Sequence, residues 1–174
     1  MIRADPPAGV AEIASCADHD GVARALLAAF KFRHLTGLAD LIAGFMADAV
    51  APLRGADQLV VPVPPARIRT WRRGFDPVAL LAARVSAETG LELAEPPALR
   101  RFGSGRQRGR GRGGRLADPP DIRPVAGADG LLAGRPVLLV DDVMTTGATL
   151  SSAAGSLLRS GASRVHALTF TRRL

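Results

Sequence analysis

The chain has 174 residues, of which 22 are arginine, one is lysine and 16 are acidic, and its net charge is +7. Seven of the arginines lie between residues 100 and 115 with no acidic residue among them, so the rest of the chain is neutral overall. This distribution excludes a protein that is basic over its whole surface, and 47% hydrophobic residues exclude a disordered chain. No apolar run approaches the roughly 20 residues of a membrane span, and a lone cysteine excludes an internal disulfide.

The first periodic segments are helical. Apolar residues recur at helical spacing from Gly21 to Phe32, and Asp20 is placed to cap the first free amides. A second helix is expected from Gly37 to about Val50, with Thr36 as its cap and Pro52 as its stop.

A short buried strand and a well-delimited helix follow. The strand is expected at Leu59 to Val63, because the Pro64-Pro65 pair behind it cannot continue a hydrogen-bond ladder. The helix is expected to begin with Asp76 as cap and Pro77 in its first turn, and to end at Gly90.

The last third of the chain reads as strand, turn, helix and strand. An apolar strand is expected at 136–140, a turn at Val143 to Gly147, a helix at about 148–160 that Gly161 stops, and a second strand at 165–170. Two strands joined through a helix form a right-handed crossover unit. We therefore predict an α/β fold with a mainly parallel sheet flanked by helices.

The length suits a single domain spanning residues 1–174. Within it we expect a helical lead-in at residues 1–57 and a flexible Gly/Arg loop at 101–118, where glycines alternate with arginines. The amino-terminal residues lack the apolar core of a signal peptide, so we expect a cytoplasmic protein.

The chemistry is concentrated after the strand at 136–140. Two carboxylates, Asp141 and Asp142, follow it directly, at the end of a strand where open α/β sheets bind ligands. A helix starts a few residues later, and its free first-turn amides favour an anion. Hydroxyls and a glycine that lets the backbone approach the anion complete this predicted phosphate-binding segment, which comprises Thr145, Thr146, Gly147, Ala148 and Thr149. Carboxylates that can bind hydroxyl groups, next to a loop that can bind a phosphate, suit a ribose 5-phosphate as the ligand.

The plainer interpretation is that Asp141 and Asp142 form a turn and that Thr146 only caps the helix. Two rival phosphate motifs are excluded by the residues. The only lysine, Lys31, is far from any glycine-rich loop, so a nucleoside-triphosphatase loop is absent. The glycine fingerprint of dinucleotide enzymes does not follow the strand at 136–140 either.

The segment Val140-Asp141-Asp142-Val143-Met144-Thr145-Thr146-Gly147-Ala148-Thr149 resembles the signature of type I phosphoribosyltransferases. Three further segments resemble, in order and spacing, the ComF branch of that family: Val61-Pro62-Val63-Pro64, Arg72-Arg73-Gly74-Phe75-Asp76, and Gln107 to Asp118. The resemblance covers roughly Asp20 to Phe170. It implies a type I phosphoribosyltransferase-like fold.

The resemblance also implies roles. Asp141 and Asp142 would be the catalytic residues that hold the ribose hydroxyls of 5-phosphoribosyl 1-pyrophosphate (PRPP), and the Thr145–Thr149 segment would hold its 5-phosphate. Mg²⁺ would arrive with PRPP, without direct metal ligation by the protein. No zinc is expected, because the cysteine-rich module usual in ComF proteins is missing. The residues that would face the pyrophosphate are Pro64, Pro65, Arg72, Arg73 and Arg106.

The expected activity is transfer of the phosphoribosyl group to a nitrogen acceptor with release of pyrophosphate. The ComF resemblance also implies an alternative, an accessory protein for DNA uptake in competence that binds DNA or protein partners and has little or no transferase activity. In that role the arginine-rich loop would bind single-stranded DNA. The apolar helices before Pro52 leave a homodimer open.

Overall fold

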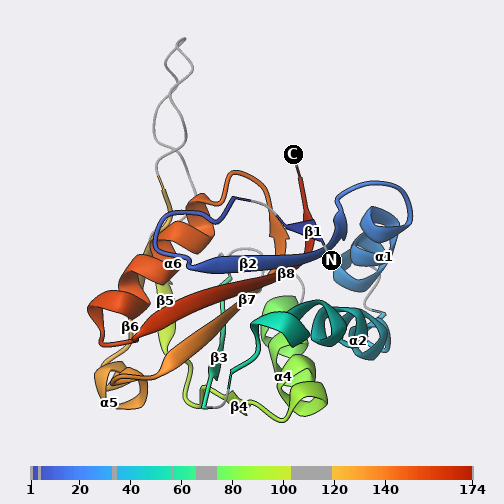
Figure 1. Cartoon of the computed structure of the whole chain (residues 1–174). Coiled ribbons are helices and arrows are strands. Elements are labelled where there is room, and N and C mark those ends of the chain that lie inside the picture. The colour runs from blue at the N-terminus through green and yellow to red at the C-terminus, as the bar shows by residue number, and fades with distance from the viewer. Residues whose placement is uncertain are drawn as a thin grey trace.

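A six-stranded sheet forms the centre of the molecule (Figure 1). The computed structural model describes residues 2–3, 5–32, 35–55, 57–65, 74–102 and 119–173. Five neighbouring strands are parallel, and only the β1 edge pairs antiparallel with its neighbour. In spatial order the strands are β1 (Ile2–Arg3), β2 (Glu12–Asp18), β8 (Arg164–Arg172), β7 (Pro136–Met144), β3 (Leu59–Pro62) and β4 (Glu92–Leu93).

Helices cover both faces of the sheet, as the prediction of a mainly parallel α/β fold required. One face packs against α1 (Gly21–Phe32), α2 (Leu38–Val50), the short 3₁₀ helix η1 (Ala51–Leu53) and α4 (Pro77–Thr89). The other face packs against α5 (Ala128–Leu132), α6 (Ala148–Arg159) and a two-stranded antiparallel hairpin of β5 (Leu99–Phe102) and β6 (Asp121–Pro124).

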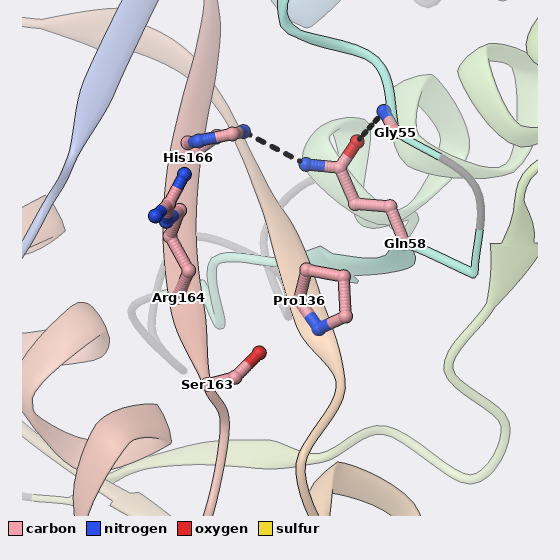
Figure 2. Close-up of a pocket in the computed structure, with 6 residues that line it drawn as sticks. All are labelled: Gly55, Gln58, Pro136, Ser163, Arg164 and His166. Atoms are coloured by element: carbon pink, nitrogen blue, oxygen red, sulfur yellow. Dashed lines mark hydrogen bonds between the residues drawn. The ribbon is translucent and has the colours of Figure 1, made fainter.

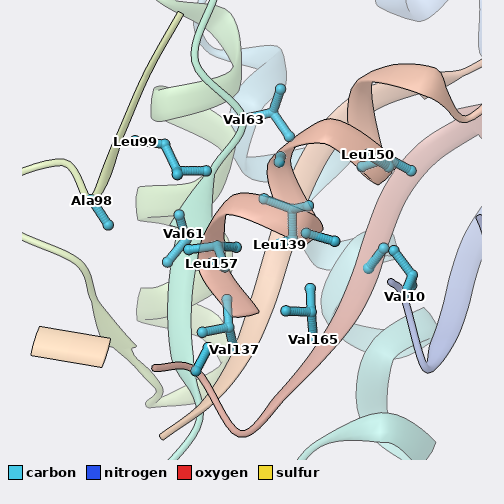
Figure 3. Packing of buried hydrophobic residues seen from close by; sticks show 14 of the residues in the cluster. Val10, Val61, Val63, Ala98, Leu99, Val137, Leu139, Leu150, Leu157 and Val165 are labelled. Atoms are coloured by element: carbon cyan, nitrogen blue, oxygen red, sulfur yellow. The ribbon is translucent and has the colours of Figure 1, made fainter. Parts of the chain in front are cut away.

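Alternate residues of the central strands enter two separate cores. Val137 and Leu139 of β7 belong to the core under α6, part of which Figure 3 shows, whereas Leu138 and Val140 belong to the core under α2 and α4. All four side chains are fully buried. Because both faces of β7 are covered, its sequence is apolar throughout instead of alternating.

The ends of α4 are those that the sequence predicts. Asp76 accepts hydrogen bonds from the amides of Val78 and Ala79 at 3.0 and 3.1 Å, and Pro77 is the first helical residue. Gly90 closes the helix in the left-handed conformation, with φ at 71°. The range predicted for α1 is also confirmed.

Two local predictions are wrong. Thr36 does not cap α2: the cap position is Gly37, no side chain bonds to the first amides, and Thr36 contributes only its backbone carbonyl, to the amide of Ala39. The strand predicted at 136–140 continues to Met144, so the turn begins only after Met144 and not at Val143. Its ladder with β8 explains the extension, because Asp141, Val143 and Met144 all have partners on that strand.

Several strands lie where sequence patterns did not predict them. The main one is β2, which lies within the predicted helical lead-in at 1–57 and pairs in parallel with β8. It contains two alanines, a serine and a cysteine among its seven residues, so it is poor in the β-branched and aromatic residues by which strands are recognised. Arg101 and Phe102, the first residues of the predicted loop at 101–118, belong to β5, and residues 103–118 lie outside the described part.

Candidate ligand site at the carboxyl edge of the sheet

The predicted site residues of two strands meet at one edge of the sheet. β3 and β7 are parallel neighbours with Pro62 opposite Val140, and the amide of Val63 donates to the carbonyl of Val140 at 2.8 Å. Both strands therefore end at the same edge. The Pro64-Pro65 turn, buried at Pro64 and half-buried at Pro65, follows β3 there, and the acid pair lies on β7.

Asp141 is almost fully buried, with 9% of its surface exposed. Its Oδ1 accepts a hydrogen bond from the amide of Asp142 at 2.8 Å. Burial raises the pKa of Asp141 to about 8, and the charge of Asp142 adds to the rise. The Asp142 amide and the cations Lys31 and Arg101 act in the opposite direction. At neutral pH this environment therefore favours a protonated Asp141 beside Asp142.

A lysine that the sequence analysis did not assign to the site completes the acid pair. Lys31, in the last turn of α1, places its Nζ 2.5 Å from Oδ2 of Asp142. Both side chains are largely buried, with 15% and 13% exposed. Two signals in the sequence pointed to Lys31: it is the sole lysine, and the segment from Gly21 to Phe32 resembles the helical lead-in of the ComF branch.

The predicted phosphate-binding segment connects β7 to α6. Thr145 and Thr146 are exposed, and Thr149 is half-buried in the first turn of the helix. No side chain caps α6 with a short bond, since the nearest contact, from the amide of Ala148 to Oγ1 of Thr146, is 3.4 Å long. The first amides of a helix have no partner within it, so this end of α6 can accept an anion.

Gly147 is required for a reason that the sequence did not reveal. Its φ of 75° lies in the left-handed region, where other residues are strained. A Cβ at this position would also lie 2.8 Å from Cγ of Pro7. Pro7 fills the space that a Cβ of residue 147 would occupy. The close approach of an anion to Gly147 stays a prediction.

The remaining predicted site residues, Arg72, Arg73 and Arg106, lie outside the described residues. The structure does bring Arg101 of β5 near enough to influence the charge of Asp141. Within the described ranges, no three His, Cys, Asp or Glu side chains are grouped so as to hold a metal ion. None of the helices in these ranges combines the length and hydrophobicity that a bilayer crossing needs.

Cys16 is not part of this chemistry. Its Sγ donates to the carbonyl of Phe45 at 3.4 Å, and burial raises the pKa of the thiol to about 12. A thiol in that state is a poor nucleophile. A packing role fits these observations.

A cavity of about 340 Å³ lies at the opposite, amino-terminal edge of the sheet, around the starts of β3, β7 and β8 (Figure 2). Gln58 and His166 line it, and they are joined by a 3.1 Å hydrogen bond between Nε2 of Gln58 and Nδ1 of His166. Nε2 of His166 is buried and has no hydrogen-bond partner among the described residues. This cavity is separate from the acid pair, which lies at the carboxyl end of β7.

A family model described as a phosphoribosyl transferase domain matches residues 99–174. That stretch begins at β5 and contains β7, the acid pair, the predicted phosphate-binding segment, α6 and β8. A search among curated proteins found no match to this sequence. The family match therefore concerns the part of the chain that carries the acid pair.

Solved structures with a similar chain path include three proteins, at TM-scores below 0.5. Glutamine PRPP amidotransferase from B. subtilis is 21% identical, with 74% of this chain and 25% of that chain covered and a TM-score of 0.48. PRPP synthetase from Mycobacterium smegmatis is 19% identical, with 78% and 33% covered and a TM-score of 0.41. The protein TT1426 from Thermus thermophilus is 18% identical, with 74% and 71% covered and a TM-score of 0.47. The chain thus spans a quarter to a third of the length of the first two.

Proposed function

We propose that this protein binds PRPP together with Mg²⁺ and transfers its phosphoribosyl group to a nitrogen acceptor, releasing pyrophosphate. One observation carries the proposal. An acid pair at the end of β7 and the uncapped amino terminus of α6 are joined by the short loop from Thr145 to Gly147. Such a site offers carboxylates for a sugar diol and backbone amides for a phosphate, within the reach of one sugar.

Each part of PRPP has a chemical counterpart in this site. Asp141 and Asp142 would accept hydrogen bonds from the 2- and 3-hydroxyls of the ribose. The amides that begin α6, with the hydroxyls of Thr145, Thr146 and Thr149, would hold the 5-phosphate. The turn at Pro64-Pro65 would lie against the pyrophosphate, because it ends the strand next to β7.

The proposed reaction is a substitution at C1 of the ribose. The bond from C1 to the pyrophosphate oxygen breaks with its electron pair, and the acceptor nitrogen forms a bond to C1 and then loses a proton. The transition state has oxocarbenium character at the ring. Catalysis of this kind depends less on a strong base than on placement and on stabilising the negative charge that develops on the departing pyrophosphate. Arginines, and Mg²⁺ when bound with PRPP, would provide that stabilisation.

Isothermal titration of PRPP with Mg²⁺ tests the binding step. The double variant Asp141→Asn and Asp142→Asn should bind PRPP at least about tenfold more weakly, because amides lack the charge that accepts the diol hydrogens. The double variant Asp40→Asn and Asp121→Asn is a matched control, since both of those carboxylates are well exposed. Absence of Mg²⁺-dependent binding by the parent chain, or equal binding by the Asp141 and Asp142 double variant, would contradict the proposal.

Pyrophosphate release over a panel of purine, pyrimidine and amine acceptors then tests transfer. Release with one acceptor would identify the substrate class. Tight binding of PRPP without release on any acceptor would instead favour a protein that senses PRPP. The ComF-type accessory role for DNA uptake is the second candidate, because the whole net charge is concentrated in residues 100–115.

A further inference from the structure

The contact between Lys31 and Asp142 lies at the centre of the proposed PRPP site. Lys31 is the only lysine of the chain, and its ammonium group reaches the acid pair from α1. The neighbouring Phe30 is fully buried and meets the ring of Phe75 edge-on, with 5.8 Å between ring centroids. Leu27 and Phe30 are the most buried residues of α1, and the Lys31 side chain that follows them is 15% exposed. The end of α1 that carries Lys31 is therefore the end that is packed.

The charges at this edge require a cation. Asp141 and Asp142 are adjacent and largely buried, so ionising both of them is opposed by repulsion in a region of low dielectric. The proposed ligand adds several negative charges of its own. The charged groups that act on Asp141 are Asp142 on β7, Lys31 on α1 and Arg101 on β5, and Lys31 forms an ion pair with Asp142.

The two contacts described for the acid pair use one oxygen of each carboxylate. Lys31 binds Oδ2 of Asp142, and the amide of Asp142 binds Oδ1 of Asp141. Oδ1 of Asp142 and Oδ2 of Asp141 are the two oxygens that these contacts do not use within the described part of the chain. A lysine in this position orients the Asp142 carboxylate without consuming both of its oxygens.

We propose that Lys31 is a positioning residue for PRPP, which orients the carboxylate of Asp142 and offsets the negative charge of the acid pair against the phosphates of the ligand. This inference rests on the proposed function. It assigns a role in the site to α1, a helix outside the residues matched by the family model.

The first experiment needs no ligand. Carboxyl ¹³C NMR titration of the parent chain and of Lys31→Met follows Asp141 and Asp142 directly. Methionine keeps the aliphatic stem of lysine and removes its charge, so the Asp141 titration should move to higher pH, and Lys31→Arg should return it. Arg24→Met is the control, because Arg24 is an exposed cation on the same helix. An unchanged Asp141 titration in Lys31→Met would overturn the inference, whether or not PRPP binds.

The second experiment measures PRPP affinity across pH 6 to 9 by isothermal titration. Lys31→Met should bind about tenfold more weakly than the parent, the free-energy equivalent of one pKa unit, with its pH inflection displaced upward. Lys31→Arg should recover most of the affinity. If Lys31→Met does not fold, as judged by circular dichroism, Lys31→Gln serves instead. A purely structural contact would lower affinity without moving the inflection, which would overturn the inference. No PRPP binding by the parent would refute the proposed function, and the ligand-free titration would still decide the role of Lys31.

Discussion

Asp141 illustrates how position in the fold sets the chemistry of a residue. The same side chain in a surface turn would be ionised at neutral pH, as the plainer interpretation of the sequence implied. In the structure the strand continues past it, so the carboxyl is enclosed beside Asp142 and its pKa rises to about 8. A diol that donates hydrogen bonds to this group favours the ionised form, so ligand binding is expected to release a proton.

Asp141 should make the free energy of unfolding depend on pH. Its pKa is about 8 in the folded chain and about 4 when unfolded, so the folded state binds the extra proton between these values. The free energy of unfolding attributable to Asp141 should therefore decrease as pH rises from about 4 to about 8, by at most about 1.4 kcal/mol per pH unit. Urea unfolding at pH 6, 7 and 8 measures the slope.

Asp141→Asn should flatten that slope, because the amide does not titrate. Asp40→Asn, which changes a carboxylate with 65% of its side chain exposed, should leave the slope as in the parent chain. Equal slopes in the parent and in Asp141→Asn would show that Asp141 titrates near its ordinary pKa.

At the scale of elements, α2 and α4 differ in how they begin. Both were expected to start at a side-chain cap, yet only Asp76 of α4 bonds to first-turn amides. At α2 the cap position falls on Gly37, one residue after Thr36, and the helix begins without a side-chain bond. Helix starts read from sequence are commonly displaced by a residue, which is enough to remove a cap.

Asp76→Ala should lower the free energy of unfolding by about 1 kcal/mol, within the range of about 0.5 to 2 kcal/mol for lost helix caps. Thr36→Ala is the comparison, and it should change stability by less than about 0.5 kcal/mol, because Thr36 bonds through its backbone carbonyl, which alanine retains. Urea unfolding of both variants at neutral pH decides the matter. A larger loss in Thr36→Ala than in Asp76→Ala would contradict the assignment of caps.

At the scale of the whole molecule, the sheet separates two regions of polar chemistry. The carboxyl edge holds the acid pair and the predicted phosphate-binding segment, while the amino edge holds the cavity around Gln58 and His166. The net charge of +7 equals the charge of the seven arginines in residues 100–115, two of which belong to β5 and the others to the sequence between β5 and β6. One of them, Arg101, acts on Asp141 at the carboxyl edge.

If the arginines of the Gly/Arg loop bind PRPP and not DNA, their removal should weaken PRPP binding, and the parent chain should not bind DNA. We expect Gln substitutions at Arg106, Arg108, Arg110 and Arg112 to lower PRPP affinity by about tenfold or more, since guanidinium groups bind pyrophosphate strongly. Filter binding of single-stranded DNA between about 50 and 200 mM salt is the measurement for the accessory role. A steep salt dependence in the parent chain, absent from the variant, would favour that role over the enzyme.

The local sequence was sufficient to predict much of this protein. Local residues predict the apolar strand and the helix in the run from 136 to 160, and they also predict both ends of α4. The fold class follows from the same periodicities, because strands buried on both faces must be apolar throughout. Local patterns missed β2, whose residues are strand-forming only when paired with β8.

By itself, then, the sequence determined which residues are candidates for the chemistry and in which order the elements around them occur. Only the tertiary structure decided which charges meet, placing Lys31 of α1 on Asp142 of β7, burying Asp141 and packing Pro7 on Gly147. The physical reason is that periodicity and capping report interactions within a few residues of the chain. The protonation of a buried acid depends instead on every element that encloses it.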